Sequence, residues 1–189
     1  MKKLILLGLA TAISISAMGA TRKKTASKNR LSAKTLELNL IHINNHHSHL
    51  EEEKMDLVLN GKKVTVNVGG MPRMIQRIAD LKKSSKNNLV LHAGDALSGT
   101  LYYTLFKGKA DAALMNVGHF DLFALGNHEF DDGNTVLKNF LDELKIPVVS
   151  ANVVPDKGSI LEGKWTPYVI KKIDGQVVAS WIRCSRKNY

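Results

Sequence analysis

Cysteine is nearly absent from this chain: its 189 residues include one, Cys184. A single cysteine excludes any disulfide within the chain, so a stable fold has to come from a hydrophobic core. The roughly 155 residues that follow position 34 are enough for one modest core, and one domain is the expected number.

Long apolar runs are also missing, apart from one at the N-terminus. Residues 4–12 are apolar or small, they follow Lys2 and Lys3, and further small residues lead to Ala20. This layout is typical of a secretory signal peptide, and the run is shorter than the roughly 20 residues that a membrane-spanning helix needs. A buried N-terminal helix is the alternative interpretation. We expect a signal peptide over residues 1–20 and no membrane attachment after its removal.

Acidic residues are too few to balance the basic ones, and the net charge of +10 raises the question of nucleic-acid binding. Residues 1–34 hold eight Lys or Arg and no acid, whereas residues 35–170 are nearly neutral with fourteen basic and sixteen acidic residues. A nucleic-acid-binding protein carries its basic patch on the folded domain. The excess lies instead in the signal, in a Lys/Arg/Ser/Thr-rich linker over residues 21–35 and in the tail. Nucleic acid is therefore not an expected partner.

The remaining apolar residues alternate between strand-like and helix-like patterns. Asn60-Gly61 lies between two β-prone segments, which is the strongest short signal for a β-hairpin. Helices are predicted over residues 71–84, 109–117 and 135–145, and strands over residues 36–42, 88–92, 122–125 and 147–150, with a further strand from about 174. This alternation predicts an α/β layered domain, in which ligands gather beyond the carboxyl ends of the strands.

Polar residues follow three of these predicted strands: His46-His47-Ser48-His49, then Gly94-Asp95, then Gly126-Asn127-His128-Glu129. Each cluster also has an ordinary interpretation, as solvated loop histidines, a turn or helix-capping aspartate, and a further turn. All seven histidines, however, lie between positions 42 and 128. Imidazole mixed with carboxylate and amide oxygens suits divalent Zn, Mn, Co or Mg rather than metals that prefer thiolates.

The order and spacing of these three loops resemble those of the calcineurin-like metallophosphoesterases. Within that superfamily the chain is most similar to the bacterial periplasmic 5'-nucleotidases and UDP-sugar hydrolases, and above all to their NAD-degrading branch. The similarity extends from about residue 36 to 175, and it is clearest in four segments, 46–51, 91–96, 99–102 and 146–153.

This resemblance implies a fold, an activity and a location. The fold would be the N-terminal part of a layered α/β metallophosphoesterase sandwich, a β-sandwich flanked by helices, over residues 36–178. The activity would be metal-dependent hydrolysis of nucleotide phosphoesters in the periplasm. The implied substrates are an AMP-like nucleotide, NAD, whose pyrophosphate would be cleaved, or a UDP-sugar.

The resemblance also assigns metal ligands. Asn45 and His47 occupy the positions that hold the first metal ion, Asp95 the position that bridges both ions, and Asn127 the position that holds the second. A bridging carboxylate can hold two cations about 3.5–4 Å apart, where they activate hydroxide and neutralise phosphate charge.

A catalytic pair follows from the same resemblance. His128, paired with Asp131 three residues on, occupies the position that stabilises the phosphoryl transition state. An imidazole held by a nearby carboxylate can protonate the leaving oxygen. Glu129, in the same motif, is interpreted as a structural hydrogen-bonding residue.

Two departures from the family pattern bear on activity. Asn45 stands where the family has aspartate, so the first metal would lose an anionic ligand and bind more weakly. The resemblance implies that the family's further histidine ligands and its nucleotide-binding C-terminal domain would lie downstream of residue 189, and residues 179–189 do not resemble the family's next strand. We expect an aberrant tail produced by a frameshift, and a chain that by itself is an inactive fragment or a metal- or nucleotide-binding remnant.

Overall fold

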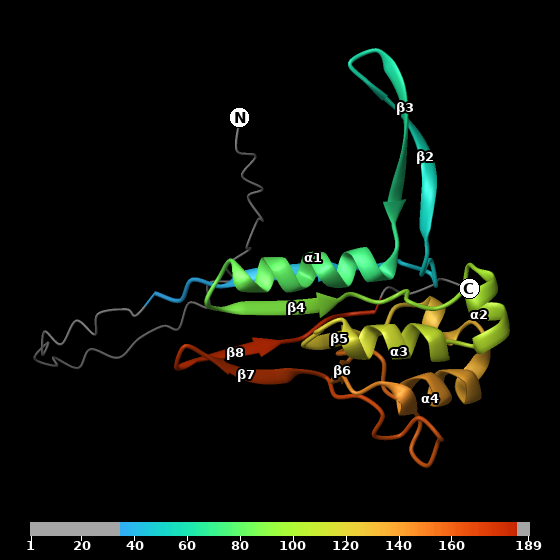
Figure 1. The fold of residues 1–189 in the computed structure, drawn as a ribbon. Coiled ribbons are helices and arrows are strands. Elements are labelled where there is room, and N and C mark those ends of the chain that lie inside the picture. Colours follow the sequence, from blue (N-terminus) through green and yellow to red (C-terminus); the bar gives the residue numbers. More distant parts are fainter. Residues whose placement is uncertain (1–34, 185–189) are drawn as a thin grey trace, which may run out of the picture. The chain divides into compact units, whose positions relative to one another are not determined.

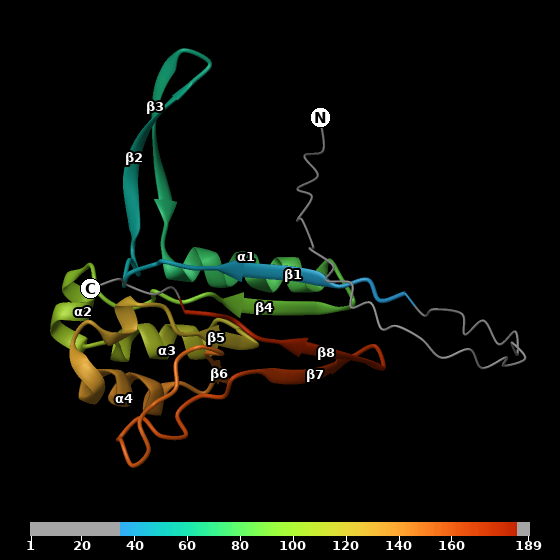
Figure 2. The same ribbon diagram turned by 180° about the vertical axis from the view of Figure 1, so that it is seen from behind.

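Four parallel strands form the central sheet of the computed structural model, which describes residues 35–184. In spatial order they are β1 (Asn39–Ile43), β4 (Asn88–His92), β5 (Leu122–Ala124) and β6 (Val148–Val149). The register aligns Ile43 with His92, Leu91 with Leu122 and Phe123 with Val148. Because all four strands point the same way, their carboxyl ends meet at one edge of the sheet (Figures 1 and 2).

Helices cover one face of this sheet, namely α1 (Met71–Lys83), α3 (Lys109–Val117) and α4 (Gly133–Glu143). Alternate strand side chains point toward them, and the resulting core contains Val90, Phe123, Ile78, Met115 and Phe140. The predicted strand–helix alternation is thereby confirmed, since each helix buries its apolar stripe against the sheet.

The other face of the sheet is covered in part by the hairpin of β7 (Val169–Ile173) and β8 (Gln176–Ser180) (Figure 2). Leu122, Ala124 and Val149 form a second, smaller core with Val169 of β7 and with Ile182. This gives helix, sheet and strand layers, as expected for the N-terminal part of a β-sandwich flanked by helices.

A second hairpin joins β1 to α1 and consists of β2 (Glu52–Leu59) and β3 (Lys62–Gly69), which pair only with each other (Figure 1). Asn60 and Gly61 at its turn have φ angles of 51° and 76°, both positive. Positive φ at both positions is the geometry that an Asn-Gly hairpin turn requires, so this prediction is confirmed.

Several boundaries differ from the sequence-based prediction. Strand β1 begins at Asn39 rather than at residue 36, and α4 covers Gly133–Glu143 rather than 135–145. The short helix α2 (Leu101–Phe106) and the 3-10 helix His128–Phe130 were not predicted at all. Both are shorter than two turns, so they show no repeating apolar pattern that could reveal them.

The C-terminal segment packs onto the domain as far as the structure describes it. Strand β8 continues to Ser180, two residues beyond the predicted end of the domain at 178. Ala151 donates its N–H to the Ile182 carbonyl at 2.9 Å, and Cys184 is buried. The predicted signal peptide, all of the linker except residue 35, and residues 185–189 of the predicted tail lie outside the described residues. Within residues 35–184, no helix has the length and apolarity needed to cross a membrane.

Candidate metal centre

Three neighbouring loops extend from the carboxyl ends of β1, β4 and β5, and they carry the predicted site residues. Hydrogen bonds between main-chain atoms join the first two loops: Asn45 N–H to the Gly94 carbonyl at 3.0 Å, His47 N–H to the Asp95 carbonyl at 3.2 Å, and Ser48 N–H to the Ala96 carbonyl at 2.9 Å. The loops thus continue the pairing of their strands, which fixes His47 beside Asp95.

Glycines bring the second and third loops into contact. Gly94 has φ of 94°, and a Cβ there would lie 2.5 Å from the nitrogen of Gly126. A side chain at Gly126 would in turn collide with Asp95. The main chains of the two loops therefore touch, which places Asp95 next to the loop that carries Asn127 and His128.

His47, Asp95 and His128 converge at this edge of the sheet. Each offers one ligand atom, and these three atoms all lie within 4.8 Å of one another. The His47 and His128 rings meet edge to face, with centroids 4.9 Å apart. Two imidazoles and a carboxylate at this spacing form a donor set suited to a borderline or hard divalent cation.

Hydrogen bonds orient the His47 ring. Its Nδ1 lies 2.9 Å from the Leu97 carbonyl and 3.2 Å from the Ser98 hydroxyl. A carbonyl can only accept, so Nδ1 carries the proton and Nε2 keeps its lone pair. A histidine oriented through its other ring nitrogen is the usual arrangement in a metal ligand.

His128 is oriented in the same way, by a carboxylate. Its Nδ1 lies 2.5 Å from Oδ2 of Asp131, and its main-chain N–H donates to Oδ1 of Asp95 at 2.9 Å. The predicted His128–Asp131 pair is therefore formed, and it is tied to the loop of Asp95 through the main chain of His128.

Glu129 is buried beneath these loops, with 2% of its surface exposed. Its carboxylate accepts four main-chain N–H groups, from Gly126 at 2.5 Å, Ala96 at 2.7 Å, Asp95 at 3.0 Å and Leu97 at 3.3 Å. Burial raises the pKa of Glu129 above its ordinary value, although these donors oppose the shift. The predicted role of Glu129 as a structural hydrogen-bonding residue is confirmed.

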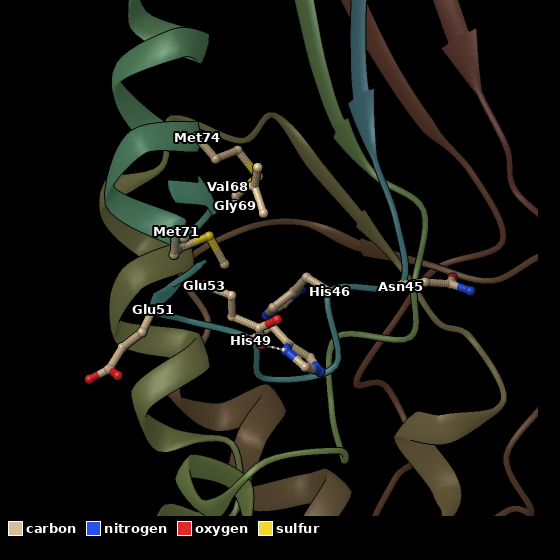
Figure 3. A pocket seen from close by; sticks show the side chains of 10 residues that line it. Asn45, His46, His49, Glu51, Glu53, Val68, Gly69, Met71 and Met74 are labelled. Atoms are coloured by element: carbon tan, nitrogen blue, oxygen red, sulfur yellow. Dashed lines mark hydrogen bonds and ion pairs between the residues drawn. The ribbon is translucent and has the colours of Figure 1, made fainter. Parts of the chain in front are cut away.

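The two asparagines lie in the loops where they were predicted. Asn45 is exposed, and its Oδ1 accepts a hydrogen bond from Asn44 at 3.1 Å. In Figure 3 its side chain points away from His46 and His49. Asn127 is half-buried and directly follows Gly126 at the contact between the second and third loops.

The three loop histidines have different surroundings. His47 belongs to the convergent cluster, whereas His49 is exposed and pairs with Glu53 at 2.9 Å. His46 instead points into the protein, where its ring contacts His92 and Asp111. Neither His92 nor Asp111 was singled out from the sequence. A signal for Asp111 exists, because it lies on the buried face of α3, one helical turn before Met115.

A cavity of about 410 Å³ lies beside the cluster rather than on it. Its walls come from the loop after β1, the base of the β2–β3 hairpin and the start of α1 (Figure 3). Its lining includes Asn45, His46, His49, Met71 and Met74. Asn45 is the residue that this cavity shares with the predicted metal ligands.

Comparison with known proteins agrees with the geometry. The family model for calcineurin-like phosphoesterases matches residues 38–177. The NAD 5'-nucleotidase of Haemophilus influenzae is 51% identical over 168 residues, which cover 89% of this chain and 28% of that protein. A probable 5'-nucleotidase of Treponema pallidum is 56% identical over 140 residues, covering 74% of this chain and 24% of that protein.

A solved structure leads to the same assignment. The NAD nucleotidase structure from Haemophilus influenzae superposes with a TM-score of 0.77 at 53% identity, covering 79% of this chain and 30% of that one. The chain thus spans less than a third of the length of these relatives. On the match over residues 38–177, and on the loops that converge at the strand ends, the chain belongs to the calcineurin-like phosphoesterase family.

Proposed function

We propose that this chain carries the N-terminal part of the active site of an exported 5'-nucleotidase, which hydrolyses nucleotide phosphoesters with two divalent metal ions. The observation that carries the proposal is the convergence of His47, Asp95 and His128 within 4.8 Å. Similarity to an NAD 5'-nucleotidase at 51% identity supports nucleotide substrates, with NAD and AMP-like nucleotides ahead of UDP-sugars.

The metal ligands in this proposal are four. Asp95 lies between the first and third loops and would bridge two ions, with His47 and Asn45 on one side and Asn127 on the other. Bound divalent cations supply positive charge to phosphate oxygens and lower the pKa of water. Zn, Mn, Co and Mg all accept this mixture of nitrogen and oxygen donors.

His128 has a separate role in the proposal. Because Asp131 accepts the hydrogen bond from Nδ1, the second ring nitrogen, Nε2, is the one available to a substrate. In its protonated form, with a proton on each ring nitrogen, His128 would stabilise the negative charge that develops on the phosphoryl group and hand its Nε2 proton to the leaving oxygen. Asp131 would hold the ring in the orientation that this transfer needs.

The described residues offer few ligands for two ions. His47, Asp95 and His128 form the one group of three or more ligating His, Cys, Asp or Glu side chains found within residues 35–184. Two ions normally share more anionic ligands than a single bridging carboxylate provides. We therefore expect this chain by itself to bind metal weakly and to turn over poorly. Residues 1–20 would direct it to the periplasm as a signal peptide.

The test is an assay of the purified chain with Mn²⁺ or Co²⁺ and with AMP, NAD or UDP-glucose as substrate. Metal content is measured in parallel by elemental analysis, and Asp95→Asn serves as the inactive control. Metal bound by the chain and reduced in Asp95→Asn would support the proposed site. Turnover far above that of the control would contradict the expected inactivity of the fragment, and absence of any bound metal would contradict the metal centre itself.

A further inference from the structure

A chain of hydrogen bonds runs from helix α3 to the two loops that carry His47 and Asp95. Asp111 Oδ1 lies 3.0 Å from His46 Nε2, and His46 Nδ1 lies 2.9 Å from His92 Nε2. His92 Nδ1 then accepts the main-chain N–H of Gly94 at 3.2 Å. The second carboxylate oxygen of Asp111 accepts the hydroxyl of Ser48 at 3.1 Å.

These groups are removed from solvent. Ser48, His92 and Asp111 have no exposed surface, and the His46 side chain is 10% exposed. A buried polar group costs about 1–3 kcal/mol when it lacks a hydrogen-bond partner. A conformation in which all these hydrogen bonds form is therefore strongly favoured over one in which any of them is broken. Each member of this chain has its partner.

Chemistry fixes the direction of every hydrogen bond. The Gly94 N–H can only donate, so His92 Nδ1 is the acceptor and His92 Nε2 carries the proton. His92 therefore donates to His46 Nδ1, and His46 donates from Nε2 to Asp111. Burial lowers the pKa of His92 well below its ordinary value, which agrees with a neutral ring in this position. One tautomer of each ring satisfies the whole chain.

The loops held in this way have unfavourable backbone conformations. His47, Ser48 and Asp95 have positive φ angles of 45°, 53° and 55°. Such conformations in non-glycine residues cost about 1–3 kcal/mol each and persist only where surrounding contacts enforce them. His46 and Ser48 flank His47, and Gly94 precedes Asp95. The hydrogen-bonded residues therefore hold both loops at positions next to the predicted metal ligands.

We propose that Asp111 is a positioning residue, which acts through His46, Ser48 and His92 to hold His47 and Asp95 in place for metal. The inference rests on the proposed metal-dependent function for its purpose, although the positioning itself is testable without metal. It assigns a role to three buried polar side chains that neither bind metal nor belong to the candidate catalytic pair. Asp111 contributes because helix α3 is packed in the core through Ala112 and Met115.

The experiment compares three variants of the full chain. Asp111→Ala removes both acceptors. Asp111→Asn keeps an oxygen for His46, and its amide can donate to the Ser48 hydroxyl, so it should restore the geometry. Asp121→Ala is the matched control, because Asp121 is also a carboxylate that accepts a main-chain N–H, that of Val90 in β4 at 2.9 Å, and it pairs with Lys171 rather than with any member of the hydrogen-bond network.

Amide hydrogen exchange is the first measurement. In Asp111→Ala the amides of His47 and Ser48 should exchange on the order of tenfold faster, whereas Ile78 in α1 should keep its protection. Asp111→Asn should stay near the unmodified chain. Asp121→Ala should accelerate exchange at Val90 and leave His47 and Ser48 unchanged. Unaltered exchange at His47 and Ser48 in Asp111→Ala, or equal acceleration in Asp121→Ala, would overturn the proposal.

Calorimetric titration with Co²⁺ is the second measurement. Loss of a residue that orients metal ligands typically weakens metal affinity 10- to 100-fold. Asp111→Ala should therefore bind Co²⁺ about tenfold more weakly than the unmodified chain, and Asp111→Asn should bind it nearly as well as the unmodified chain. Equal affinity in all three variants would show that the chain of hydrogen bonds does not serve metal binding. If the unmodified chain binds no Co²⁺, the proposed metal function fails, while the exchange data still decide whether Asp111 positions the loops.

Discussion

Nδ1 of His128 and Oδ2 of Asp131 are 2.5 Å apart, and the two residues are three positions apart in the chain. The 3-10 helix His128–Phe130 creates this contact, because its tight turn brings a residue and the third one after it to the same side. A short helix that the sequence did not reveal thus completes a pair that the sequence did predict.

This pairing predicts the tautomer of His128. With Asp131 as acceptor, Nδ1 should carry the proton, and Nε2 should be the unprotonated nitrogen of the neutral ring. Asp131→Ala should shift the population toward protonation at Nε2. Nitrogen-15 NMR of the histidine rings measures this directly, with Asp132→Ala as the control because Asp132 pairs with Lys107. An unchanged His128 tautomer in Asp131→Ala would contradict the prediction.

Restoring a carboxylate at position 45 should strengthen metal binding. Asn45→Asp adds a negative charge at the predicted first metal, and Asp tolerates the positive φ of 52° found there. We expect Co²⁺ to bind on the order of tenfold more tightly, or about 1.4 kcal/mol, in a calorimetric titration. Asn44→Asp places the same charge one residue away and should change the affinity about twofold or less. Equal gains from both variants would indicate general electrostatics instead of coordination.

Gly94→Ala should destabilise the domain. Its methyl group would lie 2.5 Å from the Gly126 nitrogen, and alanine would also be strained at φ of 94°. We expect a loss of about 3 kcal/mol in the free energy of unfolding, measured with urea. Gly61→Ala is the control, because Gly61 also has positive φ but open space around it, and it should cost only about 1 kcal/mol. Comparable losses of stability in the two variants would show that backbone strain, and not the contact with Gly126, causes the destabilisation.

Burial of His92 should make stability depend on pH. Its folded-state pKa is well below 6.5, so the unfolded chain binds the proton more readily than the folded one. The stabilisation is present above about pH 6.5 and is lost as the pH falls, by at most about 1.4 kcal/mol per pH unit. Urea unfolding at pH 7 and pH 5.5 should show a smaller pH effect for His92→Gln than for the unmodified chain. His42→Gln, at an exposed position, should keep the full effect; a full effect in His92→Gln would contradict the assignment.

Much of the fold was predictable because its signals are local. Helix α1 begins and ends within a residue of its predicted range, since Gly70, Pro72 and the terminal lysines mark its ends. Strand β7 was not predicted, although it pairs with β8 in a hairpin whose turn is Asp174-Gly175. Both turn residues have positive φ, and an Asp-Gly pair is a known sequence signal for such a hairpin turn. The convergence of His47, Asp95 and His128 was also predictable, because parallel strands bring their carboxyl ends together.

Asp111 illustrates what sequence could not supply. Its contact with His46 joins residues 65 positions apart, and it depends on how α3 packs beneath the loop after β1. No rule of sequence spacing connects Asp111 with His46, because Asp111 lies in helix α3 and His46 in the loop after β1. The buried hydrogen bonds of Asp111 therefore depend on tertiary packing, which local sequence patterns do not reveal.

Strand β1 lies at the edge of the central sheet, and Leu40 within it is 55% exposed on the face that the β7–β8 hairpin leaves partly uncovered. An open strand edge beside apolar surface is a template for pairing with other chains. For a polypeptide with this surface, the amount of folded protein in a cell depends on the relative rates of folding, self-association and proteolysis. Pairing of β1 between copies would lower the amount of folded protein, whatever its catalytic activity.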